Sequence, residues 1–343
     1  MASYKVASTE RTTAQASNAE TKALLYLMNL RDDSDEIFYF VVDFFNDVTG
    51  MNKSAVKMWD VQSKSSNNVH PQKIGQNLVT LYKNFLSDFE FHSFILFMGS
   101  PSNTVRIDDK KTSFGIDNIK PSALKKIFFG LKNEALRVSY IDSSKVSDNN
   151  LYDFLDRVLF VVDDKEPYEY IRPMIKVKPE LIPDNNTLTG IFNEIRNQQT
   201  SKKNGRSVEN ITISLPQESL NYFRHLESDK IKLLVLSRAI NVNPMDQNVP
   251  RSFIPIINNV PPEEQKEFLE DRKIGLCRAF FDKNNGDLFW GIFEEICSLV
   301  RKNPKDNVNQ LYARMNTVRE QSELFDIMTL KFFIAKIMDG LEL

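Results

Sequence analysis

Residues 57–64, Lys-Met-Trp-Asp-Val-Gln-Ser-Lys, combine polar side chains with the pattern of a β-strand. Successive side chains of a strand point to opposite faces, so Asp60, Gln62 and Lys64 would share one face. Asp47 closes the preceding apolar segment and can reach this face from a neighbouring strand. An acid, an amide and a lysine collected in this way predict a metal site with a lysine beside it.

The chemistry that such a set suits is phosphodiester hydrolysis. A divalent metal polarises the phosphoryl group and activates a water, and Mg²⁺ needs only one or two carboxylates because it keeps several waters. We expect Asp47 to be a metal ligand and Gln62 a second contact through its amide oxygen. Lys64 would stabilise the developing charge. Asp43, which shares a face with Asp47 if the strand is regular, and Asp60 are supporting acids.

The flanking pattern predicts the elements that position these residues. Ser17 or Asn18 can cap a helix that runs to about Leu30. Apolar runs and turn residues then predict strands at 36–48, 55–64 and 91–98 and a helix opened by Pro71 that runs to about residue 89. Further along, we expect helices at 121–136, 149–157 and 187–199 and strands at 138–141 and 158–162.

A polar linker at 200–207 predicts a domain boundary. The fold class is therefore α/β for residues 1–205, followed by a mainly helical domain at 206–343 that regulates, oligomerises or docks the first. Helices are expected there at 216–226, 228–239, 262–271 and almost without a break from 284 to 341. The phenylalanines of these helices are expected in a core or a subunit interface.

Asn46-Asp47-Val48, followed by Asp60-Val61-Gln62-Ser63-Lys64, resembles the PD-(D/E)xK motif in its Q-x-K variant, as in Mrr-like restriction endonucleases. The likeness is greatest to the double-stranded-DNA endonuclease domain of anti-phage effectors, found fused to SAVED sensors in CBASS and as the nuclease subunit of Lamassu systems. It covers roughly residues 10–200, and residues 188–196 resemble the closing helix of that domain.

The resemblance implies a restriction-endonuclease-like core, Mg²⁺ or Mn²⁺ as cofactor, and double-stranded DNA as substrate. It also implies a defence effector that is silent until infection, with a homo-oligomer or an SMC-like ATPase subunit as partner. Glu20 is similar to the helix-borne acid of Mrr-like enzymes. The chain departs from the family in having Asn46 where a second acid is usual, and no SAVED-like pattern follows residue 206.

Composition limits the other function classes. The 343 residues carry a net charge of −2, so a DNA-binding surface must be local, as at Lys110-Lys111, Lys125-Lys126 or Lys202-Lys203. A P-loop and a G-x-S-x-G motif are both absent from the sequence, which disfavours an ATPase or an α/β-hydrolase. Without a signal peptide or an apolar run of membrane-spanning length, a cytoplasmic protein is expected.

Two alternatives stay open. Asp43 and Asp47 can simply end an edge strand, with Lys64 solvated and paired to Asp60. The competing functional class is a non-catalytic interaction or regulatory subunit with a degenerate nuclease fold in a defence complex. Asn46 and the slightly acidic net charge favour that class.

Overall fold

The computed structural model describes residues 3–6, 14–203, 207–241, 243, 246, 248–316 and 324–341. The chain forms two compact units, each built from two stretches: Met1–Tyr170 with Phe192–Ser228, and Ile171–Ile191 with Asp229–Leu343. The boundary predicted at residue 205 is therefore wrong. Residues beyond it return to the first unit because β8 (Thr212–Ile213) pairs with β1 (Tyr4–Lys5), and β9 (His225–Glu227) pairs with β2 (Tyr39–Val42).

The first unit is organised around a seven-stranded mixed sheet in the order β6-β7-β5-β4-β3-β2-β9. Its remaining strands are β3 (Val48–Met51), β4 (Met58–Lys64), β5 (Ser93–Met98), β6 (Ser113–Phe114) and β7 (Val158–Val162). The pairs β4–β5 and β5–β7 are parallel, and the other pairs are antiparallel. The mixed α/β class is confirmed.

The segment predicted as one strand at 36–48 is a hairpin of β2 and β3. Asp43 has φ of 50°, the left-handed region that a continuing strand cannot use. Its N–H donates to the carbonyl of Asp47 at 3.2 Å, which closes a turn over residues 43–47. Three consecutive strands, β2, β3 and β4, therefore lie between the first helix and the next.

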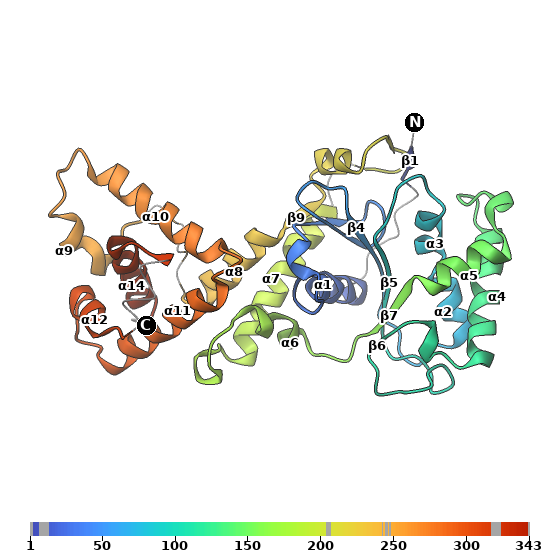
Figure 1. The fold of residues 1–343 in the computed structure, drawn as a ribbon, viewed down its shortest axis with the longest axis horizontal. Helices are drawn as coiled ribbons and strands as arrows, with labels where there is room; N and C mark the ends of the chain where they lie inside the picture. The colour runs from blue at the N-terminus through green and yellow to red at the C-terminus, as the bar shows by residue number, and fades with distance from the viewer. Residues whose placement is uncertain are drawn as a thin grey trace. The chain divides into compact units, whose positions relative to one another are not determined.

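Helices cover both faces of this sheet. Figure 1 shows α1 (Ala14–Asn29) and α7 (Asn185–Lys203) on one side, and four helices on the other. These are α2 (Pro71–Asn77), α3 (Val79–Phe85), α4 (Pro121–Arg137) and α5 (Asp148–Asp156). The helices expected at 121–136 and 149–157 and the strand at 158–162 are confirmed. The helix expected from Pro71 to residue 89 is divided at Leu78, and 138–141 forms no strand.

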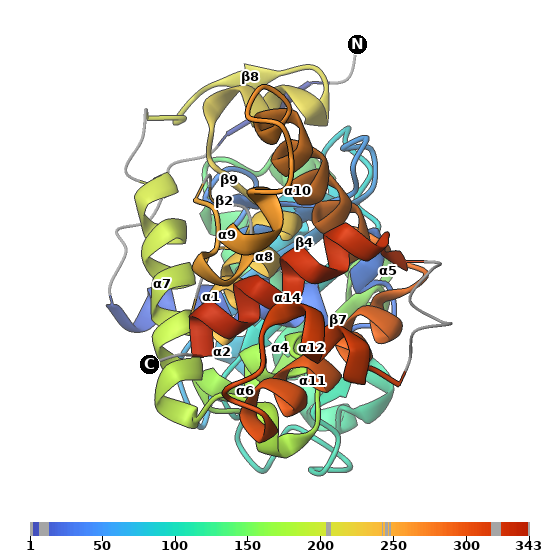
Figure 2. The same ribbon diagram turned by 90° about the vertical axis from the view of Figure 1, so that its left-hand side faces the viewer.

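The second unit is helical in the part that the structure describes. It contains most of α8 (Ser228–Ala239), then α9 (Ile254–Ile257), α10 (Gln265–Phe281), α11 (Gly286–Lys302), α12 (Val308–Arg314) and α14 (Ile327–Leu341). Helix α6 (Pro167–Ile171) belongs to the first unit except for its last residue. Helix α14 is buried over most of its length and contacts α10, α11 and α12 (Figure 2). The predicted helix at 228–239 is confirmed. Residues 216–226 instead form a 3₁₀ helix (Pro216–Tyr222) followed by β9, and the expected run from 284 to 341 is interrupted.

Most phenylalanines of this unit lie in its core, which is one of the two roles expected for them, whereas Phe280 and Phe281 are only partly buried. Phe289 stacks on Phe333 at a ring-centroid distance of 5.3 Å, and Phe325 stacks on Phe333 at 5.8 Å. All three side chains are at most 4% exposed. Burial of aromatic surface, worth about 1.5–3 kcal/mol for each side chain, thus holds α11 and α14 together.

Candidate active site

The turn between β2 and β3 brings Asp47 to the C-terminal end of β4. Val48 of β3 pairs with Val61 of β4, so the residue before Val48 lies beside the last residues of β4. Oδ2 of Asp47 accepts hydrogen bonds from Gln62 Nε2 at 2.6 Å, from Ser63 N at 2.8 Å and from Ser63 Oγ at 3.0 Å. In the described part of the chain nothing donates to Oδ1. One carboxylate oxygen is thus fixed by protein donors, and the other can meet a ligand.

Gln62 meets Asp47 through its amide nitrogen, whereas the sequence led us to expect its amide oxygen at a metal. A donor from Gln62 onto a carboxylate is a charge-assisted hydrogen bond, which is stronger and shorter than a neutral one. In this arrangement Gln62 orients the Asp47 carboxylate. The side chain of Gln62 is only 3% exposed, so packing fixes it in place.

Glu20 of α1 lies near the same point and is held by Lys203 at the end of α7. Their side chains are 8% and 7% exposed, and the ammonium of Lys203 donates to Oε2 of Glu20. Burial raises the pKa of Glu20 to about 7; the positive charge of Lys203 lowers it, and the negative charges of Asp47 and Asp43 raise it. The three carboxylates therefore interact across the space between α1 and the 43–47 turn.

Asp43, at the other end of the turn, is paired with Arg224. Oδ2 of Asp43 accepts a hydrogen bond from the guanidinium at 3.2 Å, and its backbone carbonyl accepts one at 3.1 Å. Burial raises the pKa of Asp43, the charges of Lys203 and Arg224 lower it, and Asp47 raises it. Asp43 and Asp47 are thus neighbours, although they do not share a strand.

Lys64 is the last residue of β4 and is half-buried. Desolvation raises the pKa of Asp47, and the positive charge of Lys64 is the largest effect that lowers it. The positive charge of Lys64 therefore favours the ionised carboxylate of Asp47. The alternative in which Lys64 pairs with Asp60 is not what the structure shows.

Asp60 is directed to a different set of partners. Its carboxylate is fully buried and accepts hydrogen bonds from Asn84 Nδ2 at 2.7 Å, Thr49 Oγ1 at 3.1 Å and Asn46 Nδ2 at 3.4 Å. Burial raises its pKa to about 7, although these hydrogen bonds lower it. The expectation that Asp60 serves as a supporting acid beside Asp47 is therefore corrected: it is enclosed by amide and hydroxyl donors in the core. Asn46 is one of these donors.

The donor set at Asp47 fits a hydrated divalent cation. Among the residues that the structure describes, no three His, Cys, Asp or Glu side chains converge as a ligand group. A magnesium ion nevertheless needs few carboxylates, because waters complete its shell. Oδ1 of Asp47 provides one oxygen, and Glu20 and Asp43 are acids whose pKa values the charge of Asp47 raises. A cation in this cluster would relieve the repulsion between the three carboxylates.

Two cations of this site were not predicted from the sequence. Lys203 was expected, if anywhere, at a DNA-binding surface, and Arg224 was placed in a second domain. Lys203 is 183 residues from its partner Glu20, and Arg224 is 181 from Asp43. A local pattern cannot reveal such pairings. The sequence analysis placed Lys202 and Lys203 in a linker, whereas in the structure they form the last turn of α7, where basic residues are favoured.

No family model matches the chain, and no match was found among curated proteins or solved structures. Across the residues that the structure describes, every helix is too short or too polar to cross a membrane.

Proposed function

We propose that this protein is a metal-dependent endonuclease that hydrolyses the phosphodiester bonds of double-stranded DNA. The observation that carries the proposal is the position of Asp47, which directly precedes β3 and lies beside the Gln62-Ser63-Lys64 end of β4. Glu20 on the preceding helix is close enough for its pKa to respond to Asp47. The order α1-β2-β3-β4-α2-α3-β5, with β4 and β5 parallel, supports a restriction-endonuclease-like core.

The residues of the site take distinct roles in this proposal. Asp47 holds Mg²⁺ or Mn²⁺, which when bound polarises the phosphoryl group and lowers the pKa of a water. Gln62 and Ser63 orient Asp47, and Lys64 stabilises negative charge that develops on the phosphate. Glu20, with its pKa of about 7, can accept or release a proton near neutral pH.

The biological setting follows from the resemblance of the motif rather than from the geometry. We propose an effector of anti-phage defence that is kept inactive until infection. The helical unit would serve as the place where a second copy or an SMC-like ATPase subunit binds. These assignments rest on the nuclease proposal and fall with it.

Plasmid cleavage tests the activity directly. Supercoiled DNA would be incubated with the full-length protein in Mg²⁺ or Mn²⁺, with a chelator in a parallel reaction. We expect Asp47→Ala and Lys64→Ala to reduce the cleavage rate by about 100-fold or more. Lys53→Ala, which removes an exposed lysine between β3 and β4, outside the site and outside the basic clusters, is the matched control and keeps the wild-type rate.

A non-catalytic subunit is the second candidate, and Asn46 favours it. Asn46 stands where the family has an acid, and its side-chain amide makes hydrogen bonds within the protein through both its nitrogen and its oxygen. It donates to Asp60, and its Oδ1 accepts the backbone N–H of Asp47 at 3.1 Å. If wild type and both alanine variants leave the plasmid equally intact, with and without the partner, the enzyme proposal is wrong. Cleavage that persists undiminished in Lys64→Ala contradicts the site assignment alone.

A further inference from the structure

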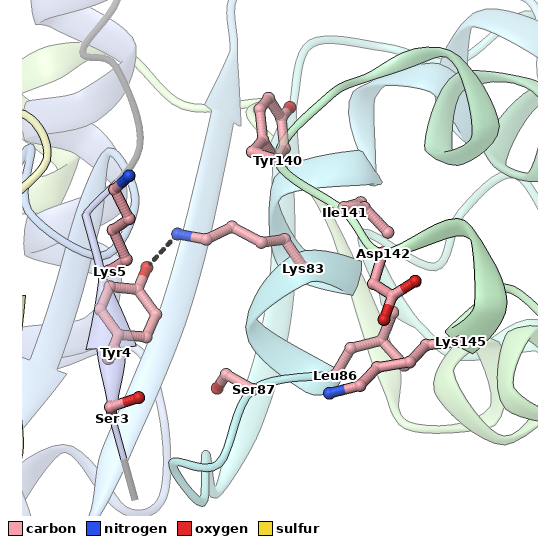
Figure 3. Close-up of a pocket in the computed structure, with 10 residues that line it drawn as sticks. All are labelled: Ser3, Tyr4, Lys5, Lys83, Leu86, Ser87, Tyr140, Ile141, Asp142 and Lys145. Carbon is pink, nitrogen blue, oxygen red and sulfur yellow. Dashed lines mark hydrogen bonds between the residues drawn. The ribbon is translucent and has the colours of Figure 1, made fainter.

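A pocket lies on the face of the sheet that carries α3, away from Glu20 and α1. Strand β1, helix α3 and the segment 140–145 form its walls (Figure 3). Its lining residues are Ser3, Tyr4, Lys5, Lys83, Leu86, Ser87, Tyr140, Ile141, Asp142 and Lys145. Figure 3 shows Lys83 reaching from α3 towards Tyr4, whose hydroxyl accepts its hydrogen bond at 2.5 Å.

The charges of this pocket favour an anion. Its lining includes three lysines against one acid, Asp142. That carboxylate is already engaged, because its Oδ1 accepts hydrogen bonds from the N–H and hydroxyl of Ser144. Asp88 lies at the border, where it accepts the N–H of Ser3 at 3.3 Å.

Lys83 is a partly buried lysine of the pocket whose ammonium has no ion-pair partner among the described residues. No carboxylate in the described part of the chain is within ion-pair distance of its ammonium, which instead lies 4.1 Å above the ring of Tyr4. Burial lowers the pKa of Lys83 to about 8, and the more distant Asp60 only partly offsets this. A phosphate group here would supply charge-assisted hydrogen bonds to an amine that the protein leaves without an ion pair.

A continuous chain of hydrogen bonds leads from this amine to the candidate active site. Tyr4 donates to Asn84 Oδ1 at 2.8 Å, and Asn84 donates to Asp60 at 2.7 Å. Asn46 donates to the same Asp60 oxygen at 3.4 Å, and its Oδ1 accepts a hydrogen bond from the backbone N–H of Asp47. In order, the chain contains Lys83, Tyr4, Asn84, Asp60, Asn46 and Asp47.

The interior members of this chain are closed to solvent. Tyr4, Asn84 and Asp60 are at most 2% exposed, and Asn46 is 7% exposed. Water therefore has little access to these groups, and a change at one end must be taken up by the next partner. A polar chain through an apolar core is a physical route by which the pocket can influence the turn at Asp47.

We propose that this pocket binds the phosphate group of a small molecule and that its occupancy alters the 43–47 turn through the Lys83-to-Asp47 chain. Lys83 is the main ligand, with Lys5 and Lys145 adding positive charge. Tyr140, 45% exposed, offers a ring on which a nucleobase can stack. The effect on catalysis rests on the proposed function, whereas binding and its effect on the turn do not.

Calorimetric titration of the full-length protein tests binding with three probes: inorganic phosphate, ribose 5-phosphate and adenosine 5′-monophosphate. We expect Lys83→Gln to weaken all three by about tenfold or more, because one charge-assisted hydrogen bond is lost. Lys83→Arg keeps the charge and most of the affinity, and Lys53→Gln, at an exposed lysine outside the pocket, is the surface control. Tyr140→Ala should weaken only the nucleotide, which identifies the source of the phosphate.

Hydrogen exchange in the segment 43–50 tests the coupling without any DNA substrate. A phosphate probe should change exchange there in the wild type and leave it unchanged in Tyr4→Phe, which keeps the ring and removes the hydroxyl. The pocket proposal is overturned if no probe binds, or if a folded Lys83→Gln variant binds the probes as tightly as the wild type. Binding with unchanged exchange overturns the coupling. A protein that binds phosphate but never cleaves DNA contradicts only the nuclease.

Discussion

Gln62 donates from its amide nitrogen to Oδ2 of Asp47 at 2.6 Å, across the boundary between β4 and the turn that precedes β3. The two residues are 15 apart in the chain and come together because β3 and β4 pair side by side. The bond makes the orientation of a carboxylate depend on a neutral amide. That dependence can be tested by changing the amide into an acid.

At about pH 8, Gln62→Glu should lower the free energy of unfolding more than Gln62→Ala does. At about pH 5 the effects of the two substitutions should become similar. At high pH the new carboxylate faces Asp47, whereas at low pH one of the pair is protonated and can donate. Loss of the original bond in either variant costs about 1.5–3 kcal/mol. Urea denaturation at both pH values measures the difference. A gap between the variants that does not depend on pH would contradict the assigned contact.

Lys203→Met should destabilise the protein by about 3–5 kcal/mol, because it leaves Glu20 buried without a counter-charge. Glu20→Gln combined with Lys203→Met should recover most of this loss, since neither position then carries a buried charge. Chemical denaturation of the single and double variants gives the coupling. Lys132→Met, which breaks an exposed pair with Asp148, is the control and should change stability by less than about 1 kcal/mol. Additive losses at Glu20 and Lys203 would refute the ion pair.

Asp60 should make stability fall as the pH rises. Its folded pKa of about 7 lies above its ordinary value of 3.8, so the protonated carboxyl is favoured in the folded state. The resulting stability is present below about pH 4 and is lost as the pH rises to about 7, with a magnitude of a few kcal/mol. The unfolding free energy of the wild type, minus that of Asp60→Asn, should decline over this window. A constant difference would show that Asp60 does not titrate there.

Gly75→Ala should separate two helices that touch backbone to backbone. A Cβ at Gly75 of α2 would lie 2.1 Å from the carbonyl oxygen of Ile127 in α4, and backbone cannot yield as a side chain does. We expect a loss of about 1–3 kcal/mol from overpacking. Gly190→Ala in α7 meets nothing within 4 Å and is the control; it should gain up to about 1 kcal/mol from helix propensity. Equal effects in thermal melts would contradict the close approach.

The parts of the fold that the sequence predicted are those with a local cause. Local residue patterns predicted the strands β4 and β7. Pro121 at the first helical position marked the start of α4. The hairpin was missed because Phe44 and Phe45, buried in the turn, extend the apolar run of β2. Only the left-handed conformation of Asp43 ends the strand there, and residue type alone does not reveal it.

The candidate site divides in the same way. Asp47 and Lys64 could be chosen from their spacing, because neighbouring strands make spacing informative. The direction of the Gln62 amide could not, since either end of an amide can face a carboxylate or a metal. Alternation along β4 correctly placed Asp60 and Lys64 on one face of the sheet. The partner that Asp60 meets there, Asn84, comes from α3, 24 residues further along the chain. Long-range packing therefore decided the roles that spacing left open.

The pairing of β9 with β2 has a practical consequence for anyone who divides this chain. A fragment that stops at residue 205 would lack β9, and the backbone N–H of Val42 and the backbone carbonyl of Phe38 would lose the partners that Arg224 and Ser228 provide. An unprotected edge of this kind is a template on which other chains can add strands. Such a fragment is expected to aggregate, and its inactivity would say nothing about the catalytic competence of the intact protein.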